Sequence, residues 1–296
     1  MARVTDDAVR EYQNYCEQLF DAVKFELRND LSGLNLSDAD IRKTIADLVA
    51  ERFGYYGSAS AELGRIWYQN CRDTETDGNG SYVATTYFND DLYGRLINDV
   101  YSIVDRLNVD ARLRLTEDEA VERISDTVAN YVHKVNRDTV VENLNIENEG
   151  VYSAPGTPTR VEQRRELRRM KRGRVAYMRV PSGNCACAFC IMMASRGAVY
   201  KTRESAGGGA DVNKYHINCR CSVVPVSVDD PFIEGYSTDE YEDQYYDARS
   251  VWTKKSYSED VARRIALGKA DAEKNGRQWK DINEIEIVMR DMYDLH

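Results

Sequence analysis

Apolar residues recur at helical spacing through most of the first half of the chain. They return every three or four positions, which is the period of an amphipathic helix, over residues 6–29, 37–54, 59–71, 90–107 and 116–144. Ser37 and Thr116 have the side chains and the positions of N-caps. Gly54 and Gly57 are expected to end the second of these helices. The pattern therefore predicts a helical domain over residues 1–145.

The period changes in the second half. Residues 146–159 contain two of the five prolines and no regular apolar spacing, so they are predicted to be a linker. Two short apolar runs, 175–180 and 222–228, are predicted to pair as strands, and a short helix is expected after Cys190. Helical spacing returns over 258–274 and 281–295.

These elements predict an α+β protein with a mainly α-helical N-terminal domain, a small Cys/His-rich α+β module and a helical C-terminal tail. The module, with a basic helix before it, is expected to occupy residues 160–228. An acidic, Tyr-rich segment and the C-terminal helices are expected over residues 229–296.

Composition restricts the function less than the pattern does. The net charge is −10 and the sequence pI is about 5.0, which argues against a protein whose whole surface binds nucleic acid. No apolar run reaches the 18 residues that would span a bilayer, so no membrane contact is expected. The opening MARVTDDAV has no basic-then-apolar signal, so we expect a reducing compartment.

The charge is unevenly spread. Between Arg160 and Arg174 eight basic and two acidic residues give a local charge of +6. Such a run is a candidate contact for DNA phosphates or an acidic protein, and a solvated helix face explains it equally well. The candidate contact residues are Arg164, Arg165, Arg168, Arg169, Lys171 and Arg172.

Five of the seven cysteines and one of the three histidines lie in two blocks between residues 185 and 221. One interpretation is a structural zinc site in which Cys187 and Cys190 form a C-x-x-C knuckle and His216 with Cys219 or Cys221 completes the tetrahedron. Reduced thiols without metal, a cysteine nucleophile activated by His216 and a disulfide remain alternatives.

The other candidate residues are expected to be structural. Cys16 and Cys71 fall on apolar helix faces, where a cysteine behaves as a small hydrophobic residue. His133 lies beside such a face with no base or ligand nearby in the sequence.

Two blocks carry a family resemblance. The run RVPSGNCACAFCIMMASRGAVY, followed by YHINCRCSVVPV, resembles the Mu F-like minor head proteins of tailed bacteriophages, and most closely the branch from phages of actinobacteria. The resemblance covers about residues 175–228. It maps the family's Cys/His positions onto Cys187, Cys190, His216, Cys219 and Cys221 and leaves Cys185 outside.

The resemblance implies a structural minor capsid protein of the virion. Such a protein would lie in the capsid interior or at the portal vertex, after assembly in the host cytoplasm. Its expected partners are the portal protein, the major capsid or scaffold protein and phage DNA through Arg160–Arg174. Some members of this branch are labelled capsid maturation proteases, so a cysteine-dependent protease is the alternative.

Overall fold

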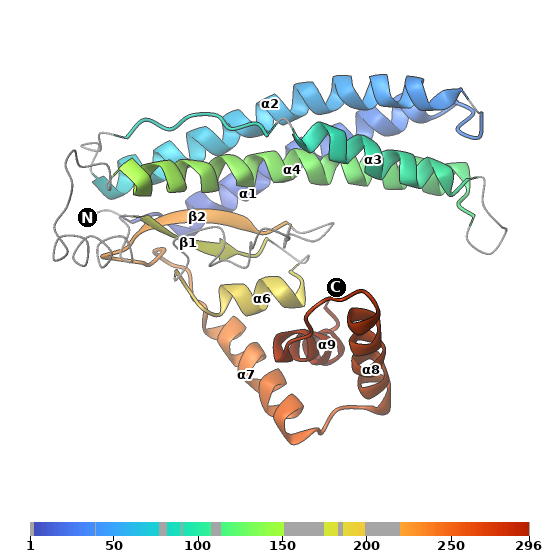
Figure 1. Cartoon of the computed structure of the whole chain (residues 1–296). Helices are drawn as coiled ribbons and strands as arrows, with labels where there is room; N and C mark the ends of the chain where they lie inside the picture. The colour runs from blue at the N-terminus through green and yellow to red at the C-terminus, as the bar shows by residue number, and fades with distance from the viewer. Residues whose placement is uncertain are drawn as a thin grey trace, which may run out of the picture.

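A computed structural model of the chain describes residues 3–38, 40–76, 82–89, 91–107, 114–150, 175–182, 186–198 and 220–295 (Figure 1). Its elements are, in order, α1 (Asp6–Leu31), α2 (Ile41–Thr76), α3 (Asp91–Asp105), α4 (Glu117–Gly150), β1 (Val175–Val180), α6 (Ala188–Ala194), β2 (Ser222–Ser227), α7 (Asp239–Lys254), α8 (Glu259–Lys274) and α9 (Asp281–Tyr293). Helices dominate, and β1 and β2 form an antiparallel sheet. The predicted α+β class is therefore confirmed.

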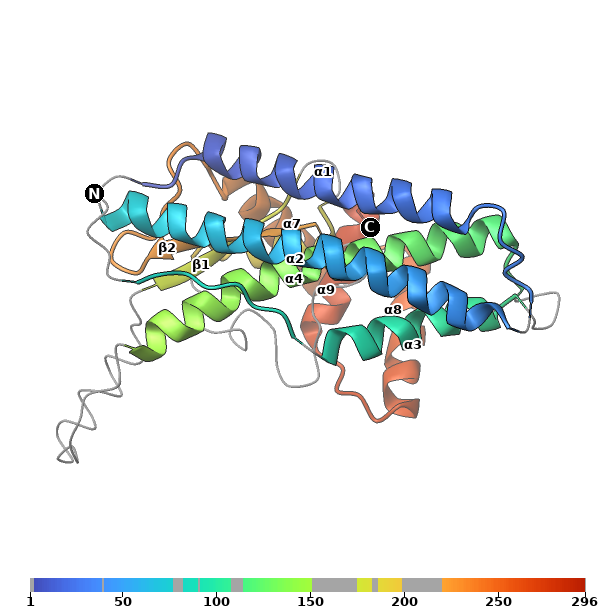
Figure 2. The ribbon, with the colours of Figure 1, turned by 90° about the horizontal axis from the view of Figure 1, so that it is seen from above.

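The three long helices α1, α2 and α4 lie side by side along the molecule (Figures 1 and 2). Toward one end they enclose a core together with α3, which includes Phe53, Leu96 and Val128. Toward the other end they enclose a second core together with β1 and β2, which includes Trp67 and Val224. The helices thus form a common frame for α3 and for the sheet.

The helix α2 is a single helix, so the predicted end at Gly54 and Gly57 is wrong. A Cβ atom on Gly57 would lie 2.7 Å from Cε2 of Phe88, which belongs to the extended residues 82–89. The glycine allows this close approach of the Phe88 ring and does not break the helix. Apolar packing along the helix outweighs the cost of an interior glycine, which is about 1 kcal/mol.

The two predicted caps have different outcomes. Thr116 caps α4 as expected, since its Oγ1 accepts from the backbone N–H of Glu119 at 3.2 Å and its own N–H donates to Glu119 Oε2 at 2.8 Å. Ser37 does not cap α2, which begins at Ile41. The Ser37 hydroxyl instead donates to Glu117 Oε1 at 3.0 Å and so joins the α1–α2 connection to the start of α4.

The antiparallel β1–β2 pair, called the hairpin below although α6 lies between its strands in the chain, confirms the strand prediction. Val175 pairs with Ser227 and Val180 with Ser222, and every residue of both strands except Ser227 is buried. Helices α2 and α4 contact the sheet from one side, and α6 contacts β1. Burial on both sides explains why apolar residues, with the exceptions of Arg179, Ser222 and Ser227, occupy both faces of the strands and do not alternate with polar residues.

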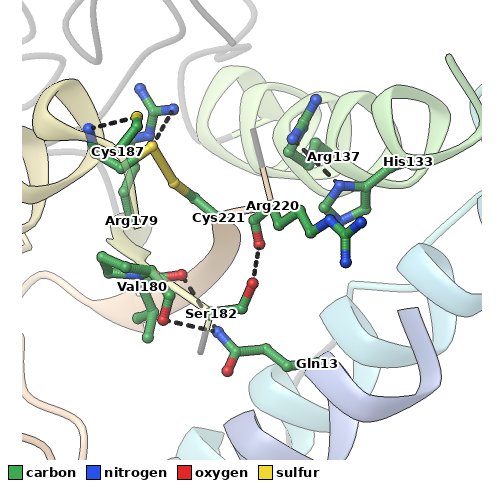
Figure 3. Close-up of a disulfide and its surroundings, with 11 residues drawn as sticks. Gln13, His133, Arg137, Arg179, Val180, Ser182, Cys187, Arg220 and Cys221 are labelled. Atoms are coloured by element: carbon green, nitrogen blue, oxygen red, sulfur yellow. Dashed lines mark hydrogen bonds between the residues drawn. A yellow bond between two sulfur atoms is a disulfide. The ribbon is translucent and has the colours of Figure 1, made fainter. Parts of the chain in front are cut away.

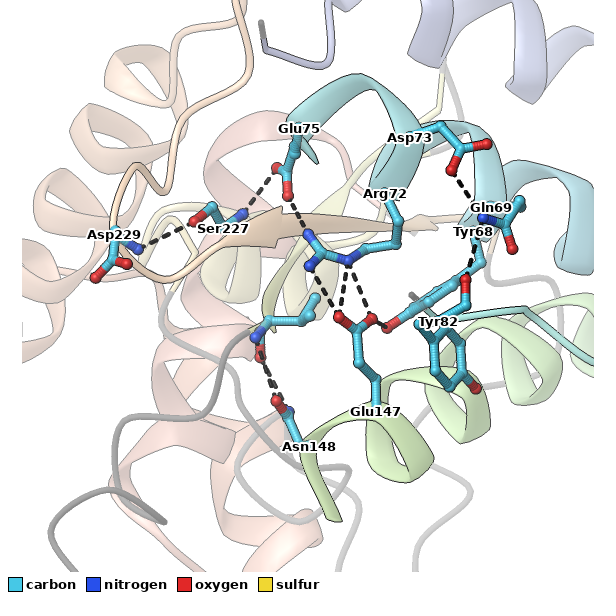
Figure 4. A network of polar contacts seen from close by, with 11 residues as sticks. Tyr68, Gln69, Arg72, Asp73, Glu75, Tyr82, Glu147, Asn148, Ser227 and Asp229 are labelled. Atoms are coloured by element: carbon cyan, nitrogen blue, oxygen red, sulfur yellow. Dashed lines mark hydrogen bonds and ion pairs between the residues drawn. The ribbon is translucent and has the colours of Figure 1, made fainter. Parts of the chain in front are cut away.

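A buried polar network holds one end of the hairpin against the helices (Figure 4). The Arg72 guanidinium donates to both Glu147 oxygens, at 2.8 to 3.2 Å, and to Glu75 at 2.5 Å. Glu75 Oε1 also accepts from the Ser227 N–H at 2.7 Å. The Asn148 side chain, one residue beyond Glu147, pairs with both the C=O and the N–H of Val175. Because the network joins α2, α4, β1 and β2, it fixes the sheet to the frame.

One cation faces two carboxylates in this network. Burial raises the pKa of Glu75 to about 7, and the negative charge of Glu147 adds to the rise, while the Ser227 N–H and Arg72 oppose it. Glu75 is therefore the group of the network that gains a proton near neutral pH.

The C-terminal helices pack on α6. Val288 and Met289 of α9 form a core with Ala188, Ile191 and Met192 of α6. Glu284 accepts from the indole N–H groups of Trp252 and Trp279, both at 3.1 Å, which connects α7 with α9. The prediction of helices over 258–274 and 281–295 is confirmed within one or two residues.

Helix α7 was not predicted. Its sequence lies in the acidic, Tyr-rich segment. Ala248 is its one buried residue, so the apolar residues do not recur clearly at helical spacing. Asp239, Glu240 and Glu242 in its first turn favour the helix through their interaction with the helix dipole. The predicted division into residues 1–145, 146–159, 160–228 and 229–296 stays a prediction.

Two glycines of α2 give a matched test of the helix frame. A Cβ atom on Gly64 would lie 2.7 Å from the Asn136 carbonyl oxygen of α4, whereas nothing lies within 4 Å of one on Gly54. Gly64→Ala should lower the free energy of unfolding by about 1–3 kcal/mol through overpacking. Gly54→Ala should raise it by up to about 1 kcal/mol. Urea denaturation measures both, and equal effects of the two changes would contradict the close α2–α4 packing.

The pKa of Glu75 predicts a pH dependence of stability. The unfolded chain releases this proton near pH 4.5, whereas the folded chain keeps it to about pH 7. The free energy of unfolding should therefore fall through this group as the pH rises between these values. Glu75→Gln should remove the fall, so the stability of the variant relative to wild type should increase by on the order of 2–3 kcal/mol between pH 5 and pH 8.

Urea denaturation at four pH values checks this prediction. Glu51→Gln, on the exposed face of the same helix, is the control and should leave the pH profile as in wild type. A stability difference between Glu75→Gln and wild type that stays constant with pH would show that Glu75 does not hold the proton.

Candidate cysteine site

The antiparallel pairing of β1 and β2 brings the two cysteine blocks together. Val180, the last residue of β1, pairs with Ser222, the first residue of β2, so the chain leaves and enters the sheet at the same end. Cys187 is the N-cap of α6, Cys190 lies in its first turn, and Cys221 directly precedes β2. The zinc interpretation requires the two cysteine blocks to meet, and the structure brings these three residues together at the strand ends.

The three sulfur atoms form one buried cluster (Figure 3). Cys190 and Cys221 are joined by a disulfide, with 6.8 Å between their Cα atoms. Cys187 is not part of that disulfide, and its Sγ accepts from the Cys190 N–H at 3.2 Å. Cys187, Cys190 and Cys221 are each 1–2% exposed. The three cysteine side chains are therefore shielded from solvent.

Arg179 adds a positive charge to the cluster. It lies in β1, is 1% exposed and is among the largest fully buried side chains of the described residues. Its Nη2 lies 3.9 Å from Cys190 Sγ, and its Cζ lies 5.2 Å from the centre of the Phe189 ring. Arg179 was not among the predicted site residues. The available signal was an arginine inside the otherwise apolar strand VAYMRV, where a charge needs a specific partner.

Helix α1 holds the chain segments that flank the cluster. The Gln13 amide donates to the carbonyl oxygens of Val180 and Pro181, both at 3.3 Å, and the Ser182 hydroxyl donates to the Arg220 carbonyl at 2.6 Å (Figure 3). The Arg220 guanidinium pairs with Glu17 and lies 4.1 Å from the centre of the Phe20 ring. These contacts fix Cys221, the next residue, relative to the helix frame.

The remaining predicted ligands and contacts lie outside the described residues. These are His216, Cys219 and the basic residues Arg164, Arg165, Arg168, Arg169, Lys171 and Arg172. Cys185, which was not a predicted ligand, also lies outside them. Among the described residues no group of three or more Cys, His, Asp or Glu side chains is arranged to hold a metal ion. A thiolate bound to zinc cannot at the same time belong to a disulfide, so zinc stays a prediction that concerns the reduced chain.

The electrostatics of Cys187 do not suit a nucleophile. Burial raises the pKa of its thiol, and the Cys190 N–H and Arg179 only partly oppose the rise. A catalytic cysteine needs the thiolate and access to substrate. Cys187 has neither property at neutral pH.

The residues expected to be structural lie in the core. Cys16 and Cys71 are buried, and burial raises the pKa of Cys16 to about 12. His133 is 7% exposed, and its Nδ1 lies 3.3 Å from a guanidinium nitrogen of Arg137.

No helix of the described part of the chain is both long and apolar enough to cross a membrane.

Comparison with known proteins gives one family. The model of the VG15 protein family matches residues 3–248, which include the helix frame, the hairpin and the cysteine cluster. Helices α8 and α9 follow the matched residues. No curated protein and no solved structure matches the chain.

The buried position of Cys187 predicts slow alkylation. In the folded, reduced chain, iodoacetamide at pH 7.5 should modify Cys187 at least about tenfold more slowly than in the urea-unfolded chain, because its thiol is protonated and covered. Mass spectrometry of peptides taken over time measures the rates, with buried Cys71 as the internal reference. Alkylation of Cys187 well before Cys71 would indicate an activated thiol and contradict this account.

Proposed function

The chain belongs to the VG15 protein family, a family of viral gene proteins, and from this premise we propose that it is a structural protein of a tailed-bacteriophage head. In this proposal the chain acts in procapsid assembly or in DNA packaging or delivery. The observation that carries the proposal is the family match over residues 3–248, which contains all of the described cysteine cluster.

A second observation supports the minor capsid role. Residues 175–228 resemble the Mu F-like minor head proteins through both cysteine blocks, the intervening Ser-Arg-Gly and the closing apolar strand. In the structure the described part of this region is the hairpin with its buried cysteines, packed on the helix frame. A buried, cross-linked element of this kind suits a scaffold for assembly contacts better than a substrate site.

The protease alternative gains no support from the described residues. Its candidate nucleophiles are Cys187, which is buried and has a raised pKa, and Cys190, which belongs to a disulfide. We therefore favour a structural role for the cysteines over a catalytic one.

The proposed partners follow from the role and from the charge. A minor head protein would contact the portal protein and the major capsid or scaffold protein, in the capsid interior or at the portal vertex. Phage DNA is a further partner through Arg160–Arg174, whose charge of +6 suits contacts to phosphates that do not depend on sequence.

Particle composition tests the proposed function. In the phage that encodes this chain, quantitative mass spectrometry should find the chain in purified procapsids and virions, in far fewer copies than the major capsid protein. A nonsense mutation in its gene should abolish infectious particles, and a plasmid copy of the wild-type gene should restore them. Absence from both particles, together with normal heads in the mutant, would contradict the proposal.

A further inference from the structure

We propose that Cys187, Cys190 and Cys221 bind one Zn²⁺ when all three are reduced, and that the structure, in which Cys190 and Cys221 are joined and no described group of side chains is arranged to hold a metal, is the metal-free, oxidised state. The chemistry rests on the cluster itself and does not depend on the proposed function.

The cluster holds one sulfur more than a disulfide needs. A structural disulfide joins two cysteines, yet the fold brings a third into the same buried cluster. Cys187 and Cys190 have the C-x-x-C spacing and Cys221 approaches from the other strand end, which is the two-part arrangement of a zinc knuckle. The Cys190 N–H that donates to Cys187 Sγ is the kind of hydrogen bond that orients a metal ligand.

A positive charge lies beside the cluster. Three thiolates and one Zn²⁺ have a net charge of −1, and the buried Arg179 guanidinium has its Nη2 3.9 Å from Cys190 Sγ. Glu286 and Arg290 of α9, which also act on the Cys187 thiol, form an ion pair with 2.6 Å between Oε1 and Nη2. A buried metal centre is stabilised when its total charge is compensated in this way. Three sulfurs leave one position of a tetrahedral zinc for a further ligand or a water molecule.

The oxidation step balances with a peroxide as the oxidant. The two thiolates Cys190–S⁻ and Cys221–S⁻ react with H₂O₂ and two protons to give the disulfide and two water molecules. The zinc ion then loses two of its sulfur ligands and leaves. A dithiol reverses the step by thiol–disulfide exchange, and the released thiols can bind zinc again.

Both states join α6 to the sheet. In one state the link is the metal, and in the other it is the disulfide. The opposite side of α6 carries the C-terminal helices through Ile191 and Met192. The reduced, metal-free chain has neither link, so the attachment of α7 and α9 should be weakest in that state.

Under the proposed function the zinc-bound and the disulfide-bonded states correspond to two environments of the protein. A phage head protein is made in the reducing cytoplasm and later lies in virions outside the cell, where disulfides persist. This setting rests on the proposed function.

The test uses the full chain, purified with a reductant from zinc-supplemented cells. Elemental analysis should find about one zinc ion per chain. Addition of H₂O₂ should release the zinc, followed with a chromogenic chelator, at the same rate at which peptide mapping detects the Cys190–Cys221 disulfide. Dithiothreitol with added zinc should restore binding.

Two variants make the test specific. Cys187→Ser keeps both disulfide cysteines, so it should lose the zinc and still form the disulfide. Cys71→Ser, a buried cysteine on α2 far from the cluster in the sequence, should behave as wild type in both assays. Circular dichroism of each variant confirms that it is folded.

Three results would overturn the proposal. The first is a reduced, folded wild-type chain without zinc after zinc is supplied. The second is zinc that remains bound when the Cys190–Cys221 disulfide has formed. The third is undiminished zinc binding by a folded Cys187→Ser variant. Failure of this test leaves the proposed function untouched, because the particle-composition experiment does not depend on metal.

Discussion

Burial of the β1–β2 hairpin on both sides is the constraint on which the rest of the structure depends. Two strands alone have little stability in water, so they need a surface to pack on. The helices α1, α2 and α4 provide that surface, and apolar residues of the hairpin such as Val223 and Val224 contribute about 1.5–3 kcal/mol each when fully buried. The Trp67 indole N–H donates to the Val223 carbonyl at 3.1 Å. This hydrogen bond gives a partner to a carbonyl group that is buried in the core.

The cysteine cluster is a consequence of this packing. The polar network around Arg72 holds one end of the hairpin to α2 and α4, and the contacts of α1 with Val180 and Arg220 hold the other end. With both ends held, the strand pairing places Cys221 opposite the start of α6. The same cluster then positions α6, on which the C-terminal helices pack. The order of dependence therefore runs from the helix frame to the hairpin, the cluster and the C-terminal helices.

Much of the fold could be predicted from the sequence because local signals agree with tertiary packing. The Thr116 cap and the strand β1 are examples. The sequence-based predictions fail where a residue contacts a part of the chain that is distant in the sequence. Gly57 makes room for Phe88, and Arg179 is buried beside sulfurs that follow it in the chain. Of the candidate site, the sequence predicted that the two cysteine blocks meet, but it left open whether Cys219 or Cys221 approaches Cys187 and Cys190. Spacing alone also cannot distinguish shared metal ligands from a disulfide.

Hydrogen exchange under native conditions tests the central claim, that the hairpin and the long helices form one cooperative unit. If they share one core, the slowest amides of β1 and β2 should exchange with the same opening free energy as the slowest amides of α2 and α4, and should respond equally to low urea concentrations. The account would be contradicted if every amide of the hairpin had an opening free energy several kcal/mol lower than the slowest amides of α2 and α4. Such a result would indicate a module that opens independently of the helices.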